Sequence, residues 1–122
     1  MTATRTRSEL GASNLSKGKA WMYDLARWLR GRGFPGADVI SGTGRADLAG
    51  LTEWTIEAKN IGDEYKLPGA LDQARRDQLD RGTPWHVVMQ KRRGKADPGQ
   101  GMAIMTIEQW ARIAAMLDKE GL

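Results

Sequence analysis

Three side chains suited to chemistry lie close together between positions 45 and 59. Asp47 stands before a glycine-containing bend, and Glu57 and Lys59 stand in the alternating polar and apolar run that follows it. Alternate side chains of a strand share a face, so Glu57 and Lys59 are expected on one face, roughly 7 Å apart along the strand. A neighbouring strand that carries Asp47 would bring its carboxylate to the same face.

Two carboxylates and one ammonium group on a sheet face are typical of metal-dependent attack on a phosphodiester. Mg²⁺ binds carboxylate and carbonyl oxygens while it keeps water and phosphate oxygens in its shell. We therefore expect Asp47, Glu57 and the carbonyl of Ala58 to bind Mg²⁺ or Mn²⁺. We expect Lys59 to orient or deprotonate the attacking water. The alternative is a surface strand with an exposed Glu–Lys pair, which contributes little free energy.

The composition excludes several other kinds of site. The chain has 122 residues, no cysteine and one histidine, His86. Disulfides, cysteine-based zinc sites and sites built from several histidines are therefore excluded, and a Ser-His triad is disfavoured. His86 lies in an apolar run and is expected to be a packed strand residue. With no apolar window of about 18 residues, we expect no membrane span. We expect one cytoplasmic domain, in the host cytoplasm if a bacteriophage encodes it.

Basic residues outnumber acidic ones, 19 to 15, for a formal net charge of +4. Clustered cations neutralise phosphates and release counterions, so they predict contacts with DNA. A glycine-containing loop at 41–45 adds donors that suit a phosphate. The candidate DNA-binding residues are Lys17, Lys19, Ser41, Arg45, Arg75, Arg76, Lys91, Arg92 and Arg93. For any one cluster, a solvated helix face or a disordered loop is an equally good interpretation.

The first half of the chain is expected to supply one helix and three strands. Residues 1–13 are polar and without periodicity, so we predict a flexible arm, with one domain over residues 14–122. Ser16 is the expected cap of a helix that ends near Arg32, where glycines follow. Short strands are predicted at 37–40 and near Asp47, followed by a bend at 50–52 and a strand at 54–59.

The second half is expected to alternate helices and strands. Pro68 suits the first turn of a helix that ends before Gly82. We predict a buried strand at 85–89, a basic loop at 90–100, a strand at 102–105, and a last helix with a capping box of Thr106 and Gln109. On the middle helix, Leu71, Ala74, Gln78 and Leu79 are expected to pack inward, and Asp72, Arg75, Arg76 and Asp80 to point outward. The expected buried stripe of the last helix is Trp110, Ile113, Ala114 and Leu117.

The predicted element order is α-β-β-β-α-β-β-α, an α/β fold with a mixed central sheet flanked by helices. With Asp47 ahead of Glu57-Ala58-Lys59, the chain resembles the PD-(D/E)XK nuclease superfamily. Within it, the chain is similar to the small Holliday junction resolvases of archaea and bacteriophages. The segment from Ser41 to Arg45 is similar to the family's Ser/Gly loop. The resemblance implies a three-layer restriction-endonuclease-like fold.

The resemblance also implies a function and a set of roles. It implies a metal-dependent, structure-selective DNA endonuclease that acts on four-way junctions as a homodimer. Asp47 and Glu57 would bind the metal, and Lys59 would position or activate water. Gln73 and Thr43 would steady the water or the phosphate.

Met22 departs from the family's pattern, because the opening helix usually carries a glutamate at this position. Asp24 lies about 200° around the helix from Met22 and does not replace that glutamate. The number of metals and the activity of the site therefore stay open. The alternatives are a nuclease for another DNA structure, a non-catalytic DNA-binding or assembly module on a nuclease fold, and a protein-interaction domain.

Overall fold

The structure, a computed structural model, describes residues 7–40, 48–60 and 66–121, and for residues 7–17 the backbone alone. The helices and strands follow one another in the predicted order. They are α1 (Arg7–Arg30), β1 (Asp38–Val39), β2 (Leu48–Ala49), β3 (Trp54–Lys59), α2 (Leu67–Arg81), β4 (Trp85–Gln90), the short 3-10 helix η2 (Pro98–Gln100), β5 (Met102–Ile104) and α3 (Ile107–Lys119).

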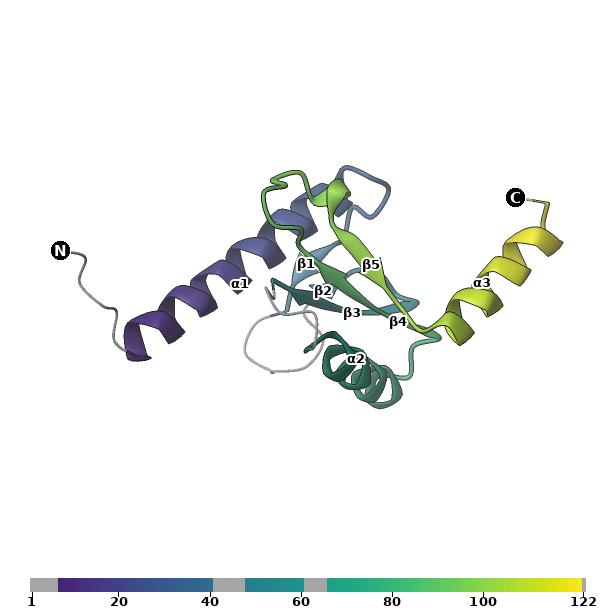
Figure 1. The fold of residues 1–122 in the computed structure, drawn as a ribbon. Helices are drawn as coiled ribbons and strands as arrows, with labels where there is room; N and C mark the ends of the chain where they lie inside the picture. The colour runs from purple at the N-terminus through teal and green to yellow at the C-terminus, as the bar shows by residue number, and fades with distance from the viewer. Residues whose placement is uncertain (1–6, 41–47, 61–65, 122) are drawn as a thin grey trace.

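The five strands form one mixed sheet in the order β1-β2-β3-β4-β5, which confirms the predicted α/β class. β3 and β4 run parallel and are joined by α2, while the other neighbouring strands are antiparallel. Helices α1 and α2 cover opposite faces of the sheet (Figure 1). No helix in the described ranges is both long and apolar enough to cross a membrane.

Helix α1 covers one face of the sheet with the stripe of apolar residues that the sequence predicts. Trp21, Leu25 and Leu29 are buried against Ile56 of β3. The indole Nε1 of Trp21 donates to the carbonyl of Met89 at 3.0 Å, which satisfies the polar atom of a buried aromatic side chain.

The predicted start of this helix at Ser16 was wrong, because α1 begins at Arg7. Residues 7–13 of the expected flexible arm are therefore helical. A serine caps a helix only where the backbone before it leaves the helical region. No proline interrupts the chain ahead of Ser16, and the helix continues through it.

Helix α2 covers the opposite face through Ala70 and Ala74, which pack on Val88 of β4. It ends as predicted at Gly82, whose φ of 71° is left-handed. The predicted inward position of Leu79 was wrong, since this side chain is 69% exposed. Asp77, at 2% exposed, is buried instead. Residues 70, 74 and 77 share one helix face by spacing, and Leu79 lies about 200° around from Asp77.

Helix α3 extends away from the sheet (Figure 1). Its predicted cap is confirmed, because the Oγ1 atom of Thr106 accepts from the backbone N–H of Gln109 at 3.2 Å. The predicted capping box was wrong in its second half, since the Gln109 side chain is bonded to β4 rather than back to Thr106. The predicted buried stripe was wrong for Trp110 and Leu117, which are 59% and 46% exposed, while its other two residues, Ile113 and Ala114, are half-buried.

The predicted bend between β2 and β3 depends on Gly50. Its φ is 88°, in the left-handed region where side chains are disfavoured. A Cβ atom at this position would overlap the carbonyl group of Gly36. The turn therefore needs glycine both for its backbone conformation and for its close contact with the chain before β1.

Candidate active site

The candidate site lies at the carboxyl ends of the parallel strands β3 and β4. In sheets of this kind, ligands bind beyond the carboxyl ends of the strands. β3 ends at Lys59 and β4 ends at Gln90, and these two residues are register partners. The backbone N–H of Lys91 donates to the carbonyl of Lys59 at 2.9 Å, so the segment that follows β4 stays adjacent to the end of β3.

Glu57 and Lys59 lie on the face of β3 that α2 covers, as the alternation predicts. Ile56, the residue before Glu57, points to the opposite face and belongs to the core under α1. Val88, the register partner of Glu57, belongs to the core under α2. Glu57 is only 4% exposed, while Lys59 is half-buried. The interpretation of Glu57 and Lys59 as an exposed surface pair is therefore wrong.

Helix α2 adds a hydrogen-bonded chain of polar groups on the same face. The Nη2 atom of Arg76 donates to Oε1 of Gln73 at 2.8 Å, and Nε2 of Gln73 donates to Oδ1 of Asp77 at 3.0 Å. The other carboxylate oxygen of Asp77, Oδ2, is buried and has no hydrogen-bond partner among the described residues. Gln73, predicted to steady water or phosphate, is thus held in place by bonds within α2.

The basic run from Lys91 to Arg93 begins beside the candidate site, because it follows β4 directly. Lys91 is half-buried, and Arg92 and Arg93 are exposed. The Nε2 atom of Gln90 donates to the carbonyl of Lys91 at 3.0 Å, which fixes the start of the run. Lys59 and the start of a cationic surface loop therefore lie together at the carboxyl ends of β3 and β4.

The other predicted site residues fall into two groups. Arg75 and Arg76 are exposed on α2, and Lys19 is exposed on α1, the helix on the opposite face of the sheet. The predicted residues that lie outside the described part of the chain are Ser41, Thr43, Arg45 and Asp47, together with the side chain of Lys17.

The described part of the predicted metal site consists of the Glu57 carboxylate and the main chain at Ala58. Carboxylate and carbonyl oxygens are hard ligands of the kind that Mg²⁺ takes, so this donor set fits the ion. Within the described ranges, histidine, aspartate and glutamate form no group of three that could bind a metal. Asp47, the second predicted carboxylate, is not among the residues covered by that search.

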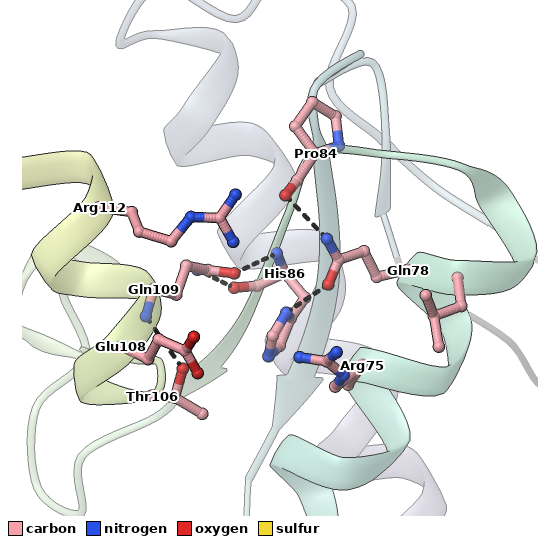
Figure 2. A pocket seen from close by; sticks show the side chains of 9 residues that line it. Arg75, Gln78, Pro84, His86, Thr106, Glu108, Gln109 and Arg112 are labelled. Atoms are coloured by element: carbon pink, nitrogen blue, oxygen red, sulfur yellow. Dashed lines mark hydrogen bonds between the residues drawn. The ribbon is translucent and has the colours of Figure 1, made fainter. Parts of the chain in front are cut away.

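A polar pocket of about 170 Å³ lies near the other end of β4, between α2 and α3 (Figure 2). Its lining includes His86 of β4, Arg75 and Gln78 of α2, and Glu108 and Arg112 of α3. His86 lies four residues before Gln90, which is about 13 Å along a strand. This pocket is therefore distinct from the candidate site at the carboxyl ends.

Hydrogen bonds from Gln78 determine the tautomer of His86. The Nε2 atom of Gln78 donates to the carbonyls of Thr83 at 3.1 Å and Pro84 at 2.8 Å. Its Oε1 atom is therefore the acceptor that faces Nδ1 of His86 at 2.6 Å, and Nδ1 carries the proton (Figure 2). Burial, and secondarily the charge of Arg75, lower the pKa of His86 below its usual 6.5. The imidazole is thus neutral at physiological pH.

Thr55 and Thr83 connect β3 to the turn that follows α2. Their hydroxyl oxygens are 2.7 Å apart, and Thr83 also donates to the carbonyl of Trp85 at 3.2 Å. A hydroxyl has one proton to donate, so Thr55 must be the donor between the two threonines. This part-buried bond ties the amino end of β3 to the turn before β4, at the start of the ladder that aligns Lys59 with Gln90.

Sequence reasoning missed two of these polar residues. Asp77 could have been found, because it continues the i, i+4, i+7 spacing of Ala70 and Ala74. The contact of Gln109 with His86 spans 23 positions and leaves no periodic signal.

Comparison with known proteins found no match to a protein-family model, to a curated protein or to a solved structure.

Proposed function

We propose that this protein is a metal-dependent, structure-selective DNA endonuclease that nicks four-way junctions, in the cytoplasm and as a homodimer. The observation that carries the proposal is the arrangement at the carboxyl end of the β3-α2-β4 unit. A buried carboxylate, Glu57, and a half-buried ammonium group, Lys59, share one face there. The cationic run from Lys91 to Arg93 begins at the same end of these strands.

The register of β2 supports Asp47 as the second carboxylate of the site. Leu48, which follows Asp47 in the sequence, pairs with Ile56, which precedes Glu57. Asp47 itself lies outside the described residues, so its place directly before Leu48 in the sequence is what supports Asp47 and Glu57 as partners in binding a metal, with the carbonyl of Ala58.

Each residue has a role that follows from its chemistry. When bound, the metal would polarise the phosphodiester and lower the pKa of a water molecule. Lys59 would hold the water or offset negative charge that develops on the phosphate. Gln73, already oriented by Arg76 and Asp77, would direct its remaining amide N–H to a phosphate oxygen.

The exposed cations would hold the DNA without reading its sequence, because contacts with phosphates position a duplex and carry little sequence information. Lys91, Arg92 and Arg93 follow β4 directly, next to the end of β3 at Lys59. Arg75 and Arg76 lie on α2. Selection of a junction would then depend on the shape of the DNA and on the spacing of two sites in a dimer.

A cleavage assay with matched DNA structures tests this function. The substrates are a labelled four-way junction, a duplex, a flap and a single strand of the same sequence, each with Mg²⁺ or Mn²⁺ and with chelator. We expect metal-dependent nicks in the junction. Stronger cleavage of the flap or duplex would reassign the substrate. Salt-sensitive DNA binding without cleavage in either metal would instead indicate a binding module. Met22, which stands where the resembled family usually has a glutamate, is the sequence feature in favour of that alternative.

A further inference from the structure

Helix α3 carries an apolar stripe that the described part of its own chain leaves largely uncovered. Trp110 and Leu117 are 59% and 46% exposed, and Ile107, at the start of the helix, is 83% exposed. Gln109 contacts β4, and Arg112 lies over the ring of Trp85 at 5.5 Å, so these two residues mark the side that faces the domain. The centre of the stripe lies about 100° around the helix from Gln109, because successive residues are 100° apart.

The same chain also has an apolar groove without a cover. It is a hollow of about 220 Å³ on the face of the sheet under α1, where that helix ends. Leu29 and Phe34 form its rim next to α1, and Trp54, Met89 and Met105 line it from the side of the sheet. Phe34 is 39% exposed. A hollow of this size and lining can receive a large apolar side chain from a partner.

The stripe cannot reach the groove of its own chain while the first turn of α3 stays anchored. Gln109 makes two hydrogen bonds with the backbone of His86, at 3.1 Å and 2.7 Å. These bonds fix the direction in which α3 leaves the sheet, which is away from the domain (Figure 1). A second copy of the chain is free of this constraint.

We propose that two copies of this chain form a symmetric dimer in which α3 of each copy lies in the groove of the other. The contact is reciprocal, as two-fold symmetry requires. It uses a recognised mode in which an amphipathic helix places its apolar face in a hydrophobic groove. The inference specifies the surface of the homodimer in the proposed function, and it does not depend on catalysis.

Charge supports a second copy as the occupant. The last turn of α3 and the residue after it carry Asp118 and Glu120, both exposed. Arg30, the last residue of α1, and Arg32, two residues beyond it, are exposed between Leu29 and Phe34 of the groove. The acidic end of α3 in one copy therefore matches the basic segment beside the groove of the other.

Sedimentation velocity of the full chain, without DNA or metal, tests the dimer. Wild type is expected to be a dimer at tens of micromolar. Trp110→Asp, on the stripe, and Phe34→Asp, at the groove, are each expected to be monomeric at the same concentration. Ala115→Asp is the matched control, since Ala115 is exposed on α3 about 140° around the helix from the centre of the stripe, and it is expected to remain dimeric. Circular dichroism of each variant checks that the fold is intact.

Mixing the two variants tests whether α3 of one copy lies in the groove of the other. Trp110→Asp chains keep a normal groove and Phe34→Asp chains keep a normal helix, so a one-to-one mixture regains one of the two contacts. We expect dimers in the mixture that neither variant forms alone. A monomeric wild type at 100 µM would overturn the proposal. A Phe34→Asp variant that dimerises like wild type would overturn it too, since α3 would then pack elsewhere. A dimer without nuclease activity refutes only the proposed function, and an active monomer refutes only this interface.

Discussion

The side-chain amide of Gln109 pairs with both backbone groups of His86 and so takes the place of a strand residue in the sheet. Val88 is the register partner of Ile104, so two further residues of the antiparallel ladder would place Thr106 opposite His86. Thr106 caps α3 instead, and Oε1 and Nε2 of Gln109 bond the N–H and C=O of His86. The side chain of Gln109 thus continues the hydrogen bonding of β4 beyond the end of β5, while its backbone N–H donates to the Thr106 cap of α3.

Replacing Gln109 by alanine is expected to destabilise the domain. The change leaves two buried backbone groups of His86 without partners, and each such group costs about 1–3 kcal/mol. Urea unfolding should show this loss in the free energy of unfolding. Glu108→Ala, one position away and exposed, is the control and should change that free energy by less than about 0.5 kcal/mol. Equal effects of the two substitutions would refute the role of Gln109.

Acid is expected to weaken the fold through His86. Burial lowers the pKa of His86 in the folded state, whereas the unfolded chain binds the proton near pH 6.5. As the pH falls below 6.5, the unfolded state therefore binds more protons than the folded state. The free energy of unfolding carries no penalty from His86 above that pH, and it decreases as the pH falls below it. Unfolding in urea at pH 7.5, 6.5 and 5.5 measures the effect.

His86→Asn provides the control for this pH dependence. An asparagine amide can still donate to Gln78 but does not titrate, so the decline between pH 7 and 5.5 should become smaller. His86 is the only histidine in the chain, which makes the assignment direct. An unchanged pH dependence in the variant would assign the effect to carboxylates.

Removal of the charges at Lys91, Arg92 and Arg93 is expected to weaken the binding of all DNA shapes alike. Each lost phosphate contact should lower the slope of log affinity against log salt by about one. Fluorescence anisotropy at several salt concentrations gives the slope for the triple alanine variant. Lys119→Ala, on α3, is the control and should leave the slope unchanged. A wild-type slope in the triple variant would place this run in solvent rather than on DNA.

The sequence predicted the elements of the sheet and its buried helices well, because these depend on local patterns. The alternation of β3 correctly placed Glu57 and Lys59 on one face, and Pro68 and Gly82 correctly bounded α2. The burial of Glu57 was not predicted. Alternation gives the face of a side chain, but only the packing of α2 on β3 decides whether that face is open to water.

The errors in α1 and α3 have a common physical cause. The cap predicted at Ser16 and the stripe that includes Trp110 are local signals, and both were interpreted without their tertiary surroundings. Ser16 lies inside a longer helix. The stripe on α3 is real, but it is exposed because Gln109 directs the helix away from the sheet. An amphipathic pattern indicates that a face will be covered and does not specify by which chain.

Asp47→Asn is expected to abolish metal-dependent cleavage without loss of stability in chelator. Two carboxylates at one site disfavour each other's ionisation when no cation is present, so removing one charge relieves repulsion. In Mg²⁺, the wild type should gain more in melting temperature than the variant, because only it has the full ligand set. If Asp47 were a structural cap instead, the variant would lose about 1 kcal/mol of stability in chelator.

The most direct test of the nuclease proposal is the single-turnover cleavage rate of a labelled four-way junction in Mg²⁺ by wild type and by Lys59→Ala. Protein in excess over the junction, and at a concentration well above the Kd of each variant, removes any effect of weaker binding from the rate. The account predicts nicking by wild type, a loss of at least about 100-fold in Lys59→Ala, and no rescue by Lys59→Arg, whose larger planar guanidinium does not reproduce the compact charge of the ammonium group. Equal rates for wild type and Lys59→Ala would contradict it.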